Sequence, residues 1–351
     1  MLAGLMGVAV ILAAGCGNLG YYGQAARGQF QIISKQEKIS HVLDSPETPA
    51  DLKKRLLLIG ELREFAEREL KLNPGRHYLR YADVDRKYVV WNVQATPEFS
   101  LKAKSWWYPI VGRQTYRGYF SESAANHYAE KLRAEGYEAY VGGVEAYSTL
   151  GWFSDPVLNT WVHRDEAGLA GLVFHELAHH KVYVSGDTPF NEAFATAVEQ
   201  AGVRLWLKQR NDSEALAKWE AAQKRRLQFV ALVKAVRSNL ARLYADTNAG
   251  GEADRRARKT TVLDEFRDDL RALRKEWGAR YYESWLTEPI SNPRLNTVST
   301  YHDLVPGFVA LLAEKSGNYS EFFKEVEKLG RKSKTKRRER LNHALSGKRA
   351  N

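Results

Sequence analysis

The segment Val173-Phe174-His175-Glu176-Leu177-Ala178-His179-His180 constrains this 351-residue chain more than any other. His175 and His179 are four residues apart, so on a helix they project from one face and both can bind one metal ion. Glu176 lies beside the first histidine, where its carboxylate can take a proton from a water on that metal. The apolar neighbours predict a buried helix. His180 falls on another helix face, and we expect it to support the site indirectly or to be structural.

A zinc site with two histidines needs a third protein ligand and an open position for water. A second helix is predicted to begin at Thr188-Pro189, because a capping residue precedes a proline at the first helical position. If this helix packs antiparallel to the first, Glu192 points back at the two histidines, and we predict it as the third ligand. Glu199 lies two turns further along the same face. It is both a candidate hydrogen-bond partner for a ligand histidine and the rival third ligand.

The remaining sequence predicts an α+β fold that is mostly helical. Periodic apolar positions indicate helices over 30–71, with a break at 45–49, and over 121–135. Residues 88–95 and 138–147 have the β-branched and aromatic character of strands, which predicts a small mixed sheet beside the histidine helix. Charged helices over 213–246 and 253–277, split by Thr247-Asn248-Ala249-Gly250-Gly251, predict a long antiparallel hairpin. We expect one domain over 30–330, with the hairpin inside it.

The N-terminus carries the only cysteine of the chain, Cys16. Residues 1–15 form an apolar run that is short for a membrane span and has the length expected of a signal peptide. The sequence Leu12-Ala13-Ala14-Gly15-Cys16 resembles a bacterial lipobox, although no Lys or Arg precedes the apolar run. This predicts a lipid anchor at Cys16, a tether over 16–29, and a location in the envelope of a Gram-negative bacterium. Gly17 after the cysteine resembles lipoproteins of the outer membrane that face the periplasm. The alternative is a buried helix with an incidental cysteine.

The C-terminal segment 331–351 is strongly basic and contributes to a net charge of +11. Such a tail could touch anionic lipid or nucleic acid. We expect instead a solvated, poorly ordered terminus. No nucleic-acid recognition motif is visible, and we expect no nucleic-acid partner.

Two groups of motifs resemble known zinc peptidases. His175-Glu176-Leu177-Ala178-His179 with Asn191-Glu192-Ala193-Phe194-Ala195 resembles the peptidases with a glutamate ligand, the gluzincins. More narrowly, the chain is similar to the predicted bacterial aminopeptidase family of envelope lipoproteins over residues 16–324, on the segments 147–153, 155–158, 292–295 and 301–306. Ser291-Asn292-Pro293-Arg294-Leu295 departs slightly from the family pattern. The resemblance implies a zincin-like fold, a zinc cofactor and a peptide substrate.

Further roles remain open alternatives. Glu176 is expected to act as general base, and Tyr301 and His302 either donate to the oxyanion or pack in the core. Val144–Thr149 is the candidate edge strand that binds substrate backbone. Gly151 would allow the substrate backbone to approach closely. Tyr147 and Trp152 are candidates to line the cleft, although both could equally be packing residues.

The activity itself also has alternatives. An aminopeptidase needs an acidic anchor for the free amine of its substrate, for which Glu145 is a candidate, whereas an endopeptidase needs none. The chain could also be a zinc-containing envelope binding or assembly protein, but an intact Glu176 has no use in a purely structural site. A third alternative is a helical scaffold whose hairpin binds a partner.

Overall fold

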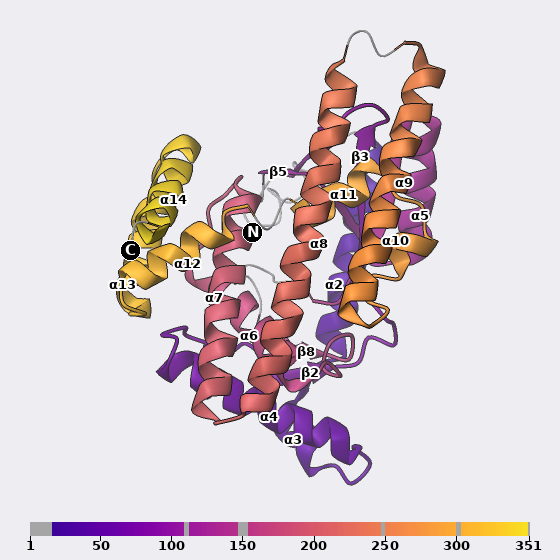
Figure 1. Cartoon of the computed structure of the whole chain (residues 1–351). Coiled ribbons are helices and arrows are strands. Elements are labelled where there is room, and N and C mark those ends of the chain that lie inside the picture. Colours follow the sequence, from indigo (N-terminus) through magenta and orange to yellow (C-terminus); the bar gives the residue numbers. More distant parts are fainter. Residues whose placement is uncertain (1–15, 109–111, 147–153, 247–249, 300–302, 350–351) are drawn as a thin grey trace.

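The computed structural model describes residues 16–108, 112–146, 154–246, 250–299 and 303–349 (Figure 1). The helices are α2 (Cys16–Ser34), α3 (Ile39–Asp44), α4 (Ala50–Arg68), α5 (Glu122–Ala134), α6 (Glu166–Lys181), α7 (Thr188–Gln209), α8 (Ser213–Ala245), α9 (Glu252–Trp277), α10 (Ser284–Thr287), α11 (Asn292–Ser299), α12 (Val305–Glu314), α13 (Tyr319–Gly330) and α14 (Lys334–Arg349). The strands are β1 (Glu37–Lys38), β2 (Arg80–Ala82), β3 (Val90–Pro97), β4 (Trp106–Tyr108), β5 (Gly112–Gln114), β6 (Arg117–Tyr119), β7 (Tyr137–Val144) and β8 (Val157–Leu158). The protein is therefore mostly helical with small sheets, which agrees with the predicted α+β class.

The largest core surrounds α6 and α7, which pack against each other along their lengths. α4 covers α6, and α12 covers α7. Phe174 of α6 stacks on Phe65 of α4, and Phe194 of α7 contacts the rings of Phe308 and Phe322. Burying aromatic side chains from five helices in this way contributes to the apolar core that fixes α6 and α7.

Three small sheets take the place of the single mixed sheet that we predicted. The mixed sheet has the order β1-β2-β8, in which β1 and β2 are antiparallel and β2 and β8 are parallel. An antiparallel sheet has the order β6-β3-β7, and β4 pairs with β5 in a third sheet. α5 packs on β3 and β7 and begins at the predicted cap, where Ser121 Oγ accepts from Ala124 N. In the described part of the chain, β7 is an edge strand of its sheet.

The predicted helical hairpin is confirmed as α8 and α9, which pack against each other on one side of the molecule (Figure 1). Its core contains Phe229, Phe266 and Trp285. The segment beginning at Asn292 joins the hairpin to the antiparallel sheet. The buried Asn292 amide donates to the carbonyl of Glu98 at 2.9 Å, and Glu138 of β7 accepts from Asn292 N at 2.8 Å.

The structure corrects the expectation of a tether over 16–29, because most of these residues belong to α2. Gln24 attaches this helix to the antiparallel sheet, because its side-chain oxygen accepts from Phe120 N, next to the end of β6, at 3.0 Å. Residues 1–15, the expected signal peptide, lie outside the described residues. No helix in the described ranges is both long and apolar enough to span a membrane.

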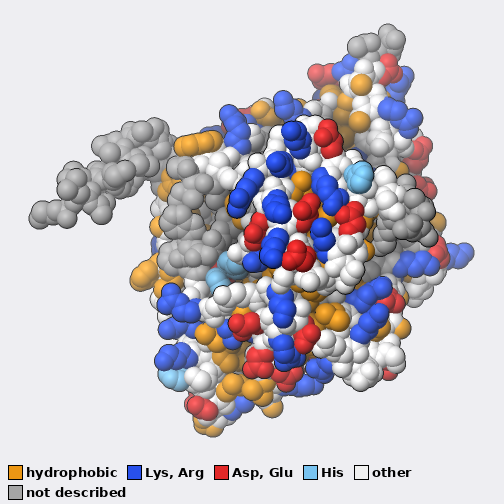
Figure 2. Space-filling model, turned by 90° about the vertical axis from the view of Figure 1, so that its left-hand side faces the viewer, with side chains coloured by type: hydrophobic (Ala, Val, Ile, Leu, Met, Phe, Trp, Pro, Cys, Tyr) orange, Lys and Arg blue, Asp and Glu red, His pale blue; other side chains and the backbone are white. Residues whose placement is uncertain are grey.

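The expectation of a disordered basic tail is also wrong, since residues 334–349 form α14. This helix packs on α12, with Leu341 and Ala344 buried. Arg337 is buried as well and forms an ion pair with Asp187 at 2.8 Å. On this face of the molecule, Lys and Arg side chains are interspersed with Asp and Glu (Figure 2). The basic composition of the tail therefore does not create a continuous positive surface on this face.

Candidate metal centre

The two helices that carry the site are joined by a short loop that local interactions hold in place. Asp165 caps the start of α6, accepting from Gly168 N at 2.7 Å. After α6, Gly186 turns the chain with a φ of 76°, a region that favours glycine. The buried side chain of Asn191 then bonds both the N–H and the carbonyl of Val184, at 2.8 and 2.9 Å. These bonds fix the angle between α6 and α7, and so the position of Glu192 on the first turns of α7.

The structure brings the side chains of His175, His179 and Glu192 together. His175 Nε2 lies 3.2 Å from His179 Nε2. The Glu192 carboxylate lies 3.5 Å from His175 Nε2 and 3.7 Å from His179 Nε2. The three side chains therefore present one ligand atom each to a common point, and such a group could hold a metal ion.

These distances fit a tetrahedral metal. An ion with bonds of about 2.0–2.1 Å to its ligands places neighbouring ligand atoms about 3.3 Å apart. Two imidazole nitrogens and one carboxylate are also the donor set that suits zinc in catalytic sites. The side chains thus fit the ion that the sequence predicts without rearrangement of the helices.

Glu199 lies on the opposite side of the His175 ring from Glu192. Its carboxylate is 3.0 Å from His175 Nδ1, and its other oxygen is 3.8 Å from the guanidinium of Arg226. Glu199 is therefore placed to orient His175 rather than to share a metal with the two Nε2 atoms. His179 differs, because its Nδ1 is buried without a hydrogen-bond partner among the described residues.

The protonation of the two histidines follows from these contacts. Burial lowers the pKa of His175, but hydrogen bonds to Glu192 and Glu199 outweigh it and raise the pKa to about 10. Burial lowers the pKa of His179 to about 4, and the neighbouring His175 adds to this shift. Burial raises the pKa of Glu192, but its bond to His175 outweighs it, so the pKa is lowered overall. Without a metal, the site therefore holds a proton on His175, which metal binding must release.

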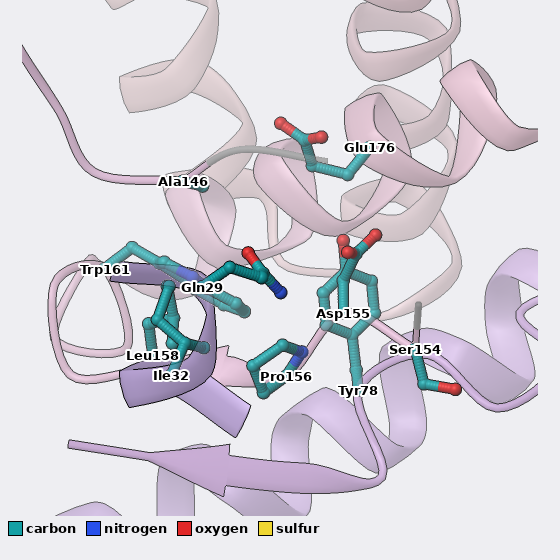
Figure 3. A pocket seen from close by; sticks show the side chains of 10 residues that line it. All are labelled: Gln29, Ile32, Tyr78, Ala146, Ser154, Asp155, Pro156, Leu158, Trp161 and Glu176. Atoms are coloured by element: carbon teal, nitrogen blue, oxygen red, sulfur yellow. The ribbon is translucent and has the colours of Figure 1, made fainter. Parts of the chain in front are cut away.

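Glu176 of α6 lines both the main cleft and the rim of a small pocket of about 20 Å³ (Figure 3). Asp155 and Tyr78 lie across this pocket from it. Burial raises the pKa of Glu176 to about 7, with added repulsion from the carboxylates of Glu192, Asp155 and Glu199, against the opposing effect of His175. A carboxylate with a pKa close to neutral is suited to take up a proton and give it back.

Asp155 also joins a second polar cluster, with His77 and His180. Its Oδ2 lies 3.0 Å from His180 Nε2 and 3.3 Å from His77 Nδ1. His77 Nδ1 already accepts from Asp155 N at 3.1 Å, and the two imidazole rings lie 3.9 Å apart. With the lone pair of His77 Nδ1 used in this bond, the cluster is better suited to tie β8 and α6 together than to hold a metal, although its residue types allow one.

A cleft of about 490 Å³ opens onto His175, Glu176, His179 and Glu192. Its other walls come from α2, the antiparallel sheet and α7. Val144 at the end of β7 lines it, as do the phenols of Tyr116 and Tyr183. Burial and the Glu192 carboxylate raise the pKa of both phenols, that of Tyr116 to about 12. Both side chains therefore stay protonated near neutral pH and can donate hydrogen bonds into the cleft.

The family described as "Putative aminopeptidase" matches residues 20–341. The chain belongs to this family. No curated protein and no solved structure matches it. Membership of the aminopeptidase family suggests peptidase activity, and the His/Glu cluster is compatible with a metallopeptidase.

Several residues for which the sequence predicts a functional role lie where the structure does not describe them. Tyr301, His302, Tyr147, Gly151 and Trp152 lie outside the described residues. Cys16 begins α2, but its side chain is also outside them. These roles therefore remain predictions.

Other predicted residues are placed away from the cleft. Glu145 forms an ion pair with Arg164 at 2.6 Å and does not line the cleft, so the structure gives no support to Glu145 as an anchor for a substrate amine. His180 faces Asp155 rather than the group at His175. His77 is its neighbour in that cluster.

Sequence reasoning missed Asp155 and Arg226. Asp155 precedes a proline in a loop and belongs to no periodic pattern that would have singled it out. Arg226 is one of many basic residues on a charged helix, and only the packing of α8 against α7 brings it near Glu199.

Proposed function

We propose that this protein hydrolyses peptide bonds with a zinc ion held by His175, His179 and Glu192. The observation that carries this proposal is the convergence of their three ligand atoms beside Glu176 on one wall of a cleft. The aminopeptidase family of the chain supports the same reaction.

The positions of the residues support a separate role for each of them in the reaction. Zinc bound there would supply a Lewis acid that polarises the scissile carbonyl and makes water more acidic. Glu176 takes the proton of the attacking water and later delivers it to the leaving amine, so the nitrogen departs as a neutral amine. The near-neutral pKa of Glu176 suits both transfers. Glu199 keeps the His175 ring in place by accepting from its Nδ1.

The oxyanion that forms on the carbonyl needs a hydrogen-bond donor. Tyr301 and His302 remain our candidates from the sequence. Tyr116 and Tyr183 are further candidates, because both phenols line the cleft and are held protonated by burial and by Glu192. The substrate backbone is proposed to pair with the edge strand β7 where Val144 meets the cleft.

The test compares wild type with Glu176→Gln, an isosteric change that removes the base and leaves the three proposed ligands. We expect about one zinc per chain in both proteins and peptide cleavage only in wild type, with a loss of at least about 100-fold in the variant. Mass spectrometry of the products shows whether single N-terminal residues are released, as the family description suggests. Zinc in both proteins without cleavage of a broad peptide library would instead favour a binding or assembly role.

A further inference from the structure

A second, open cavity, of about 370 Å³, also reaches the proposed zinc ligands. His175 and Glu192 line both this cavity and the main cleft. The remaining walls come from α7, α8, α11 and Tyr282. A peptide bound at the zinc site therefore has room to extend in two directions.

Among the described residues that line this second cavity, Arg226 is the only arginine or lysine. Phe229 and Val230 lie on the same face of α8, three and four residues further on, and line the cavity beside it. The ring of Phe229 is stacked on that of Tyr282, with 3.9 Å between the ring centroids and an angle of 9° between the rings. This stacking holds the wall of the cavity in place. The wall beside Arg226 is thus apolar and aromatic, while His175, Glu192 and two threonines, Thr196 and Thr297, supply the polar part of the lining.

The guanidinium of Arg226 has N–H groups that are available to donate hydrogen bonds to a ligand. Its ion pair with Glu199 spans 3.8 Å, which is beyond hydrogen-bond distance, and its side chain is 38% exposed. A guanidinium carries five N–H donors in a planar fork that matches the two oxygens of a carboxylate. An arginine in a largely apolar cavity that also reaches the reacting centre is well placed to receive such a group.

We propose that Arg226 binds a carboxylate of the substrate, within the second cavity, and so sets the specificity of the peptidase. This proposal rests on the proposed function. The carboxylate is either the C-terminus of a short peptide or an acidic side chain. Glu199 contacts both His175 and Arg226, so the carboxylate belongs to a residue a few positions from the cleaved bond, since an extended chain advances about 3.3 Å per residue.

The experiment uses matched peptides. One pair differs only in a free C-terminal carboxylate or an amide, and further pairs carry Glu or Gln at each position near the cleaved bond. We expect wild type to favour the acid of one pair by about tenfold in kcat/KM, the size expected of a charge-assisted bond. Which pair responds distinguishes the C-terminus from a side chain. Arg226→Gln is expected to abolish the preference, and a ratio within each protein cancels any general loss of activity.

Arg225→Gln is the matched control. It removes the same charge one residue earlier on α8, where the side chain lies over the ring of Tyr281 and outside the cavity lining. This variant should keep the acid preference. Should Arg226→Gln lose zinc through its contact with Glu199, Arg226→Lys keeps the charge, loses the fork and is expected to weaken the preference. Cleavage by wild type with no acid preference, or a preference that both Arg226 variants retain, overturns the proposal and leaves the peptidase intact.

A binding measurement separates the two claims. Calorimetric titration of Glu176→Gln with the same peptides should show tighter binding of the acid by about tenfold, without turnover. Acid-selective binding together with no cleavage by wild type would refute the peptidase function and still support Arg226 as a carboxylate site.

Discussion

His175 is central to the candidate site, because both of its ring nitrogens contact other residues of the site. Nε2 faces His179 and Glu192, while Nδ1 faces Glu199. The two glutamates come from the same face of α7, two turns apart, and differ only in which nitrogen they approach. Their roles should therefore differ in a way that matched substitutions can separate.

At this scale we predict unequal effects of Glu192→Gln and Glu199→Gln on zinc affinity. Glu192→Gln removes a ligand and should abolish tight binding. Glu199→Gln removes only the acceptor for His175 Nδ1 and should weaken binding by about 10- to 100-fold. Competition with a chromophoric chelator measures both. A larger loss in Glu199→Gln than in Glu192→Gln would assign the third ligand to Glu199 instead.

The helices that carry the candidate site could be predicted from the sequence better than the helices that pack against them. α7, α8 and α9 begin within about one residue of the positions expected from the sequence, which are 188, 213 and 253. Helix α14 was missed, because residues 331–351 were taken for a poorly ordered tail. Its composition concealed two buried apolar residues, Leu341 and Ala344, and one buried arginine. A run of charged residues predicts a solvated segment only if none of the charges pairs with a residue elsewhere in the fold. Here Arg337 pairs with Asp187.

The same contact predicts that α14 stabilises the loop between α6 and α7. Arg337→Ala leaves the buried Asp187 carboxylate with only the longer contact to Lys334, at 3.7 Å. We expect the free energy of unfolding to fall by about 3–5 kcal/mol, as when one partner of a buried ion pair is removed. Urea denaturation followed by circular dichroism measures the change.

Arg338→Ala serves as control, because it removes the neighbouring, exposed arginine of the same helix. It should change stability by no more than about 0.5 kcal/mol. Equal and small effects of the two substitutions would show that α14 does not support the loop.

At the scale of the whole molecule, three apolar cores meet around the candidate site. One surrounds α6 and α7, one fills the hairpin of α8 and α9, and one lies between α5 and the antiparallel sheet. The main cleft lies where the first and third adjoin, and the cavity at Arg226 lies where the first and second adjoin. The hairpin is therefore not only a solvated cover, since it forms one wall of a cavity that reaches His175.

The sequence predicted the local part of this arrangement and not the long-range part. A four-residue spacing on an apolar helix and a capped second helix were enough to bring His175, His179 and Glu192 together. The partners of Glu176 were not foreseen, because Asp155 and Tyr78 come from loops whose approach depends on the packing of β2, β8 and α6. Arg226 was missed for the same reason, as 34 positions separate it from Glu192.

The most direct test of the account is an anomalous difference map at the zinc edge from crystals of the zinc-loaded protein. We predict one peak between the Nε2 atoms of His175 and His179 and the carboxylate of Glu192, about 2.0–2.2 Å from each. A peak only at the cluster of His77, Asp155 and His180, or no peak in the described part of the chain, would contradict the assignment.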